Sequence, residues 1–312
     1  MTPDLWLILL LAVALDRIFG EPPRKAHPTV WMGIIIDFFK EKTFEEKRKD
    51  FLYGFFIFST VTFTFATAAF VILSNLGPIS TILIGVFILK VTFSWKDMAG
   101  HARPIKNAVD RGDLEEARIS LSKIVGRDTK GLDETHIISA TVESIGEGSV
   151  DGIASPIFYY LVMGSVFGVP AGVAAAVFFR ATSTLDSMIG YKRYGAKGYT
   201  AAKIDDILNY LPSRIMGLVI IASSFILGEN WKNAIEVFEN DKMVTPSPNS
   251  GHTMAALAGA LGVGLEKEGV YSLGGRVEKL ETDHISKAIH VVDFSIIIFI
   301  VFTLAAVLGV HV

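Results

Sequence analysis

The sequence lacks several features on which familiar activities depend. Its 312 residues include no cysteine, which excludes disulfide bonds and thiolate metal sites. It has no GxxxxGK[ST] phosphate loop and no HExxH zinc helix. The seven histidines show no close pairing that suggests a metal site. A net charge of −3 gives no sign of nucleic-acid binding.

Charged residues are also scarce, and they are unevenly distributed. Only 20% of residues are charged, 51% are hydrophobic, and the mean hydropathy is +0.46. Residues 51–73 contain no charge, and 291–312 contain only Asp293 and His311. About 20 apolar residues cross the hydrocarbon core of a bilayer as a helix. The composition therefore predicts an integral membrane protein in contact with lipid.

The apolar segments predict an all-α, polytopic membrane protein with a single domain over residues 1–312. The first segment follows an N-terminus that lacks the basic region of a signal peptide and continues into Asp16 and Arg17, so we expect a retained membrane helix. The predicted segments lie near 5–15, 51–73, 79–93, 153–179, 215–227 and 291–312.

The basic residues predict which loops face the cytoplasm. Residues 20–50 carry seven Lys or Arg, 94–152 carry eight, and 180–214 carry six. Basic loops tend to remain cytoplasmic. We therefore expect a multi-pass protein of the cell membrane with cytoplasmic helical loops and its active site on the cytoplasmic side. The charges of 229–290 leave the side of that segment open.

The segment 153–179 has two interpretations. Flanking basic loops on one side of the membrane would require it to enter and leave on the same face, as a re-entrant pair of half-helices. Its centre, GSVFGVPAG at 164–172, is rich in helix breakers, and irregular backbone at membrane depth is tolerated where protein covers it. One kinked span is the alternative.

The loop 94–152 contains helical signals and an acidic motif. Leu114, Ala117, Leu121 and Ile124 form an apolar stripe at helical spacing, and Gly126 is expected to end that helix. Farther along, ESIGEGSVDG contains three acidic residues at i, i+4 and i+8, which would form one face of a helix. Such a face is either solvated or neutralised by a cation such as Mg²⁺. Its members are Glu143, Glu147 and Asp151.

The stretch RATSTLDSMIGYKRY, residues 180–194, and DDILNYLPSR, residues 205–214, mix acids, hydroxyls and bases. A membrane-flanking belt would consist mainly of Lys, Arg and aromatics, whereas a polyanion site with a metal ion would have this mixture. The candidate side chains are Arg180, Thr184, Asp186, Lys192, Arg193, Asp205, Asp206 and Arg214.

Two shorter motifs are ambiguous by themselves. GRDT at 126–129, which contains Arg127, is typical of a helix end followed by a solvated turn. In SPNSG at 247–251, Asn249 or Ser250 can cap a helix, whose free N–H groups could also bind an anion.

Taken together, these motifs resemble the CbiB/CobD family of cobalamin biosynthesis. The resemblance rests on LDRIFGEPPRKAHPTVWMG, GRDT, EGSVDGIASPIFY, RATSTLDSMIGYKRY, DDILNYLPSR and SPNSG, which occur in the family's order over residues 15–275. Two positions depart from its pattern, because the family usually has Asn where this chain has Gly148 and Ser183.

The resemblance implies adenosylcobinamide-phosphate synthase activity. In this reaction an ADP-forming ligase joins the propionate carboxylate of adenosylcobyric acid to (R)-1-amino-2-propanol O-phosphate, or to aminopropanol. The implied cofactors are ATP and Mg²⁺. Other membrane proteins of cobalamin assembly are expected partners. The rival interpretations are a corrinoid-binding transporter and a non-catalytic membrane component.

Such a ligase must hold Mg-ATP, a second phosphate and a carboxylate, so we assign the polar side chains accordingly. Glu143, Glu147, Asp151 and Asp186 are predicted to bind Mg²⁺. Asp205 or Asp206 is predicted to accept the amine proton, with Arg180 also catalytic. The predicted substrate- and phosphate-binding residues are Arg127, Thr184, Lys192, Arg193, Arg214 and Asn249.

Overall fold

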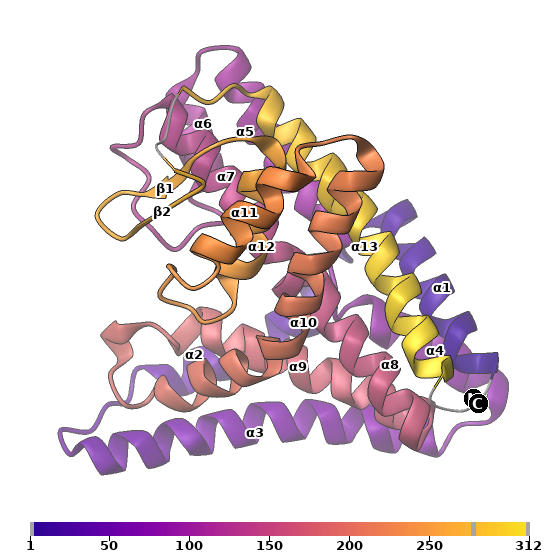
Figure 1. Ribbon diagram of the computed structural model, residues 1–312. Helices are drawn as coiled ribbons and strands as arrows, with labels where there is room; N and C mark the ends of the chain where they lie inside the picture. Colours follow the sequence, from indigo (N-terminus) through magenta and orange to yellow (C-terminus); the bar gives the residue numbers. More distant parts are fainter. Residues whose placement is uncertain (1–2, 276–278, 310–312) are drawn as a thin grey trace. The chain divides into compact units, whose positions relative to one another are not determined.

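A computed structural model describes residues 3–275 and 279–309 of the protein (Figure 1). Regular structure in these residues is helical apart from one antiparallel pair of short strands, so the predicted all-α class is confirmed. The helices up to the middle of the chain are α1 (Pro3–Phe19), α2 (Pro28–Lys40), α3 (Lys47–Ser74), α4 (Pro78–Lys90), α5 (Trp95–Asp110), α6 (Leu114–Leu121) and α7 (Glu134–Ser149).

The second half continues the helical pattern. The π-helical turn η2 (Val150–Ala154) joins α7 to the next helix. The remaining elements are α8 (Ser155–Phe167), α9 (Val169–Ile189), α10 (Tyr199–Leu227), α11 (Trp231–Asp241), α12 (Ser250–Leu261), β1 (Leu265–Lys267), β2 (Tyr271–Leu273) and α13 (Asp283–Gly309), with 3-10 turns η1 (Arg24–Ala26) and η3 (Lys192–Tyr194).

Five helical stretches of the described chain are long and apolar enough to cross a membrane, which confirms a multi-pass membrane protein. They are Lys47–Ser74, Pro78–Asp110, Glu134–Phe167, Tyr199–Leu227 and Asp283–Ala306. The predicted segment 5–15 lies within α1, whose 17 residues are slightly short for this set. The predicted segment 215–227 is the apolar end of α10, which begins much earlier, in polar sequence.

The chain divides into two compact units. The first contains the described parts of Met1–Ser94, Ser155–Asn209 and Thr303–Val312, and the second contains Trp95–Ala154 and Tyr210–Phe302. Both units are discontinuous in sequence. The division falls between η2 and α8 and again within α10.

In the first unit, α9 packs against α3 and α8, and α1 packs against α4 (Figure 1). The segment 153–179 is a helical hairpin and not one kinked span, because the chain turns back between α8 and α9. Gly168 makes this turn with φ of +86°, a conformation that glycine adopts without the steric cost of a side chain. Pro170 then lies in the first turn of α9, where its missing N–H costs nothing.

The two helices of this hairpin approach closely at Gly172. A Cβ atom at this position would lie 2.5 Å from the Tyr160 carbonyl oxygen. The hairpin is also fixed by Tyr159, whose ring stacks on Phe179 with centroids 5.9 Å apart. Small residues at helix interfaces allow this backbone contact inside membranes. The helix breakers recognised in the sequence therefore have a packing role.

In the second unit, α7 contacts α5, α6, α12 and β1, while α11 and α12 pack as a pair (Figure 1). The predicted helix over 113–125 is confirmed as α6, with Asp113 capping its start by accepting a hydrogen bond from the Glu116 N–H at 3.0 Å. It ends at Leu121 and not at Gly126, because the backbone of 122–125 forms a tighter turn.

Candidate functional site

The GRDT motif contributes an ion pair to the second unit. Arg127 Nη2 donates to Glu143 Oε2, and Glu143 is only 2% exposed. The motif is therefore more than a solvated turn after a helix. The same carboxylate accepts a hydrogen bond from the Tyr271 hydroxyl at 2.7 Å and another from Ser139 Oγ at 2.8 Å. Glu143 thus has three donors around it.

Glu143 and its three donors, Arg127, Tyr271 and Ser139, form a cluster that also connects α7 to the strand pair. The Glu266 backbone N–H donates to Ser139 Oγ at 2.8 Å, and Tyr271 comes from β2. Burial and the neighbouring Glu143 charge raise the pKa of Tyr271, so its hydroxyl remains a hydrogen-bond donor at neutral pH. Of these residues, sequence analysis named only Arg127 and Glu143.

The three predicted acidic residues of this region do not share one environment. Glu143 is buried, whereas Glu147, one turn later on α7, is exposed. Asp151 follows in η2, where the π-helical turn changes the angular spacing of side chains. The three acids therefore differ in burial and in local backbone, with Glu143 and Glu147 on α7 and Asp151 in the π-helical turn.

A second cation of this unit binds the SPNSG motif. Arg214 Nη1 donates to Asn249 Oδ1 at 3.2 Å, and Arg214 Nη2 donates to the Pro248 carbonyl at 3.4 Å. Its guanidinium also lies 3.4 Å from the centroid of the Tyr210 ring. Asn249 precedes α12 without a side-chain cap hydrogen bond, since its oxygen faces Arg214. The structure therefore brings Arg214 and Asn249 together.

His252, in the first turn of α12, was not singled out by sequence analysis. It is 4% exposed, and its ring packs edge-on against Phe238. Burial, followed by the positive charge of Arg214, lowers the pKa of His252 to about 4. A neutral imidazole therefore lies beside the Arg214–Asn249 contact.

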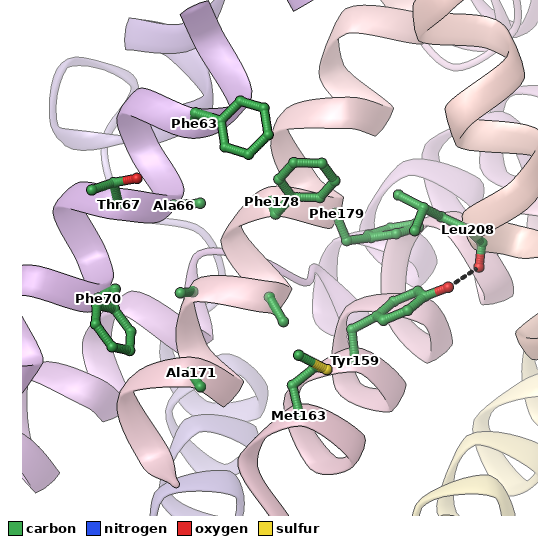
Figure 2. A pocket seen from close by; sticks show the side chains of 12 residues that line it. Phe63, Ala66, Thr67, Phe70, Tyr159, Met163, Ala171, Phe178, Phe179 and Leu208 are labelled. Carbon is green, nitrogen blue, oxygen red and sulfur yellow. Dashed lines mark hydrogen bonds between the residues drawn. The ribbon is translucent and has the colours of Figure 1, made fainter. Parts of the chain in front are cut away.

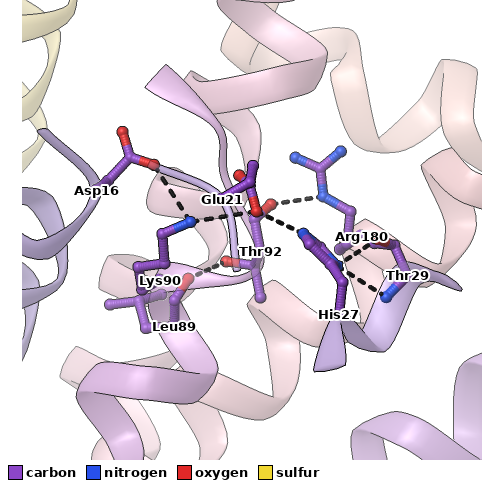
Figure 3. A network of polar contacts seen from close by, with 8 residues as sticks. All are labelled: Asp16, Glu21, His27, Thr29, Leu89, Lys90, Thr92 and Arg180. Carbon is purple, nitrogen blue, oxygen red and sulfur yellow. Dashed lines mark hydrogen bonds and ion pairs between the residues drawn. The ribbon is translucent and has the colours of Figure 1, made fainter. Parts of the chain in front are cut away.

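In the first unit, Arg180 is anchored to the turn after α4. Its Nε donates to the Thr92 carbonyl oxygen at 2.6 Å, and the terminal nitrogens are directed away from Thr92 (Figure 3). Thr184 lies one turn later on α9, and its hydroxyl donates to the Arg180 carbonyl at 2.7 Å. The Thr184 hydroxyl is therefore engaged as a donor to the backbone of its own helix.

Three predicted carboxylates also belong to this unit. Burial, and secondarily the charge of Asp206, raise the pKa of Asp186 to about 6. The carboxylate of Asp186 lies over Gly190, where an added Cβ would come within 1.9 Å of Oδ1. Asp206 forms an ion pair with Lys203 at 3.3 Å, and Asp205 accepts a hydrogen bond from Asn209 at 2.9 Å.

The remaining predicted positions have simpler surroundings. Arg193 is exposed and lies over the rings of Tyr191 and Tyr194, 5.2 and 5.0 Å from their centroids. The side chain of Lys192 lies outside the described residues. An added Cβ at Gly148 would meet no atom within 4 Å, so an alanine side chain fits there. Nothing in the described structure explains Ser183.

The first unit contains a buried ionic cluster that sequence analysis missed (Figure 3). Lys90, in the last turn of α4, is 5% exposed. Its Nζ lies 3.5 Å from Asp16 Oδ1, on α1, and 3.2 Å from Glu21 Oε2, in the following loop. The side chain of Asp16 is completely buried.

Glu21 connects this cluster to the start of α2. His27 Nε2 lies 2.5 Å from Glu21 Oε2, while His27 Nδ1 faces the Thr29 N–H at 3.2 Å. Because a backbone N–H can only donate, Nδ1 accepts and Nε2 carries the proton given to Glu21. Burial opposes the ionised form of Glu21, but the bond from His27 and the Lys90 charge lower its pKa overall.

The sequence does contain one feature that could have indicated this cluster, namely Lys90. It is the one charge within the predicted apolar segment 79–93. Ionisable residues inside apolar membrane segments are costly and are typically retained for function, with a partner nearby. Asp16, Glu21 and His27 also lie in the LDRIFGEPPRKAH motif, to which no role had been assigned.

An apolar cavity of about 420 Å³ also lies in the first unit, among α3, α8, α9 and Leu208 of α10 (Figure 2). Aromatic rings and alanines dominate its lining. The Tyr159 hydroxyl donates a hydrogen bond to the Leu208 carbonyl oxygen at 2.8 Å. Such a surface offers no charge to a phosphate or carboxylate. The polar clusters are therefore the better candidates for catalysis.

The predicted acidic residues differ in how well they fit a Mg²⁺ ion. Within 3–275 and 279–309, no three or more His, Asp or Glu side chains are grouped as a metal site. Mg²⁺ in nucleotide sites, however, uses only one or two carboxylates, completed by waters and phosphate oxygens. Asp186 and Asp206, whose charges repel, fit that chemistry better than Glu143, which already accepts from three donors.

The fold and these clusters define a class: a multi-pass helical membrane protein with ionisable side chains organised around the ends of its apolar helices. Residues 9–295 match the protein family described as CobD/Cbib protein. The chain therefore belongs to the CobD/CbiB family, a family of cobalamin biosynthesis. This confirms the resemblance identified in the sequence.

Relatives from several organisms align over nearly the whole chain. A probable cobalamin biosynthesis protein CobD of Methanocaldococcus jannaschii is 39% identical, covering 95% of this chain and 96% of that protein. One from Methanothermobacter thermautotrophicus is 36% identical, with 96% of each covered. A cobalamin biosynthesis protein CobD of Dehalococcoides mccartyi is 36% identical over 91% of each chain. No solved structure matches the chain.

Proposed function

We propose that the protein is an adenosylcobinamide-phosphate synthase. It would join the propionate carboxylate of adenosylcobyric acid to the amine of (R)-1-amino-2-propanol O-phosphate, or of aminopropanol, with conversion of ATP to ADP and phosphate. The observation that carries this proposal is the occurrence of acids, hydroxyls and bases together at Arg180–Asp206 in a CobD/CbiB family member. A plain membrane component has no need of such a mixture.

The chemistry explains why both charge signs are needed. A carboxylate does not react with an amine at neutral pH unless it is first activated, and an ADP-forming ligase usually makes an acyl phosphate. Catalysis then depends on positioning and on neutralising phosphate charge. Arg127, Arg180, Arg193 and Arg214 are proposed to bind phosphate, and their planar guanidinium groups suit two-point contact with its oxygens.

Asp186 is the residue we propose for Mg²⁺ binding, with Asp206 as the neighbouring carboxylate. When bound, the ion would neutralise charge on the phosphates of ATP. Glu147 and Asp151 remain candidates for the same role. Asp205 or Asp206 is proposed to accept the proton of the attacking amine. Asn249, held by Arg214 at 3.2 Å, would orient substrate.

A corrinoid-binding transporter is the second candidate. The helical hairpin broken at Gly168 favours it, because discontinuous helices often line transport sites in membranes. A transporter would bind adenosylcobyric acid but would not consume ATP to form an amide.

Reconstitution with purified protein separates the two. Full-length protein in detergent is given adenosylcobyric acid, aminopropanol phosphate and Mg-ATP, and amide and ADP are measured by mass spectrometry and a coupled assay. We expect both products in equal amounts, and neither when any one substrate is omitted. Corrinoid binding without ATP turnover would exclude the synthase.

Variants then test the site. Arg180→Ala should lower turnover by about 10²-fold or more, as expected for a lost charge contact in a ligase transition state. Arg48→Ala removes an exposed arginine of the same unit and should leave turnover unchanged. Equal turnover in both variants would remove Arg180 from the site.

A further inference from the structure

Asp205 and Asp206 are neighbours in sequence, but the structure gives them different surroundings. Consecutive residues of an α-helix point about 100° apart. Asp206 forms an ion pair with Lys203, and its charge acts on Asp186. Asp205 is 9% exposed and faces Asn209. The two carboxylates therefore cannot serve interchangeably.

Asn209 lies one turn beyond Asp205 on α10 and is 2% exposed. Its Nδ2 donates to Asp205 Oδ2 at 2.9 Å. The i, i+4 spacing places the two side chains on the same face of the helix. A buried amide in this position restrains the rotation of the carboxylate.

Asn209 is itself held by Ser155, the completely buried first residue of α8. Ser155 Oγ donates to Asn209 Oδ1 at 2.6 Å. Because the Asp205 carboxylate can only accept, the amide nitrogen of Asn209 must face it. The amide oxygen then faces Ser155, whose hydroxyl must donate. The two hydrogen bonds therefore fix the orientation of the Asn209 amide and the direction in which each bond is donated.

Burial makes this chain of contacts specific. A buried amide or hydroxyl without a partner is costly, so apolar residues would be the simpler choice at both positions. Ser155 instead donates to Asn209, and Asn209 donates to Asp205, so both hydrogen bonds help to fix the orientation of one carboxylate. Both belong to motifs that sequence analysis quoted, ASPIFY and DDILN, without giving either residue a role.

We infer that Asp205, and not Asp206, accepts the proton of the attacking amine, and that Ser155 and Asn209 are positioning residues that hold its carboxylate. The inference rests on the proposed function. In the step, the amine nitrogen forms a bond to the acyl carbon, and the bond from that carbon to the phosphate oxygen breaks. Phosphate leaves with the bonding electrons, and the N–H proton passes to Asp205 and then to water.

The step can be tested apart from carboxylate activation. Hydroxylamine is largely unprotonated at neutral pH, so it can intercept an acyl phosphate with little need for a proton acceptor. The purified full-length protein is therefore assayed twice, with aminopropanol phosphate for amide formation and with hydroxylamine for hydroxamate formation. Adenosylcobyric acid and Mg-ATP are present in both assays.

Asp205→Asn should lower kcat for the amide by about 10²–10⁴-fold, the usual contribution of a positioned general base, and should leave hydroxamate formation within a few-fold of wild type. Asn209→Leu should also lower only amide formation, to roughly a tenth or less of the wild-type kcat. Ser155→Ala should lower the kcat for amide formation by a smaller factor. Asn75→Leu removes an exposed amide of the same unit and should change neither rate.

Asp206→Asn should affect both reactions together. A selective loss of amide formation in Asp206→Asn, but not in Asp205→Asn, would overturn the inference. Equal loss of both reactions in Asn209→Leu would show that Asn209 is only structural. If wild type formed neither product, the proposed function itself would fail, which is a different outcome from either of these.

Discussion

Each compact unit buries a salt bridge, but the two are built differently. In the first unit, Lys90 Nζ lies 3.2 and 3.5 Å from two carboxylates, and within the described structure it makes no hydrogen bond of good geometry. In the second, Glu143 accepts hydrogen bonds from Arg127, Tyr271 and Ser139. The first is held mainly by charge, and the second by directed hydrogen bonds.

This difference predicts different responses to mutation. Removing one member of a buried ion pair leaves a buried charge whose desolvation cost is no longer offset by attraction to its partner. Removing one of several hydrogen bonds to a carboxylate leaves the others in place, so the cost is smaller and graded. Substitutions in the first cluster should therefore cost more free energy of unfolding than substitutions in the second.

Lys90→Met should destabilise the protein by about 3–5 kcal/mol, because Asp16 and Glu21 lose the cation between them. The free energy of unfolding is measured by denaturation in detergent. Lys49→Met, at an exposed lysine, serves as the control. The double variant Lys90→Met/Glu21→Gln should recover part of the lost free energy of unfolding. A cost below about 1 kcal/mol for Lys90→Met alone would show that charge does not hold this cluster.

A pH titration probes a different buried group, His252 of the second unit. Its pKa falls from 6.5 to about 4 on folding, so the unfolded chain binds the proton more tightly. The stabilising contribution is complete above pH 6.5 and is lost as pH falls toward 4, by about 3 kcal/mol in total.

His252→Asn should therefore flatten the dependence of unfolding free energy on pH between 6.5 and 4. His101→Asn, at an exposed histidine of the same unit, should leave that dependence as in wild type. A wild-type slope that survives in His252→Asn would assign the titration to another group.

Glu143→Gln should cost about 2 kcal/mol, since it weakens the charged hydrogen bond to Arg127 but keeps the shape of the side chain. Tyr271→Phe removes one hydroxyl donor and should cost about 1 kcal/mol. Both are measured by the same denaturation assay. If Glu143→Gln cost as much as Lys90→Met, the distinction between the two clusters would be lost.

The smallest effect is expected at Gly148, which departs from the family pattern. Glycine in a helix costs about 0.5–1 kcal/mol relative to alanine, and a Cβ here meets nothing within 4 Å. Gly148→Ala should therefore stabilise the protein slightly. Gly146→Ala is the matched comparison, because its Cβ would already contact Met254 at 3.4 Å, and it should gain less.

Much of the fold could be predicted from local patterns. Uncharged runs such as 51–73 exceed the length needed to cross a bilayer, and helix breakers at 164–172 indicated the turn found at Gly168. The start of α10 could not be predicted from hydropathy, because its first turns are polar. The end of α6 was predicted four residues too late, since turn geometry after Leu121 leaves no strong signal in composition.

For the candidate site, the sequence suggested residues but not their contact partners, and the assignment of those residues to a site stays a prediction. Arg127 and Glu143 were both named, yet their pairing depends on the packing of 126–129 against α7. The pairing of Arg214 with Asn249 likewise joins residues 35 positions apart. Lys90 was visible as a charge in an apolar segment, but Asp16 and Glu21 become its partners only when α1 lies beside α4.

The sequence by itself determined the membrane character, the helical class and the family, because these follow from composition, segment length and motif order. Tertiary structure alone decided which side chains share an environment. Hydrogen bonds and ion pairs act over about 3 Å, and only packing brings Ser155 to Asn209 across 54 residues or Lys90 to Asp16 across two helices. The proposed chemistry therefore depends on pairings that the tertiary structure shows and that sequence motifs alone do not.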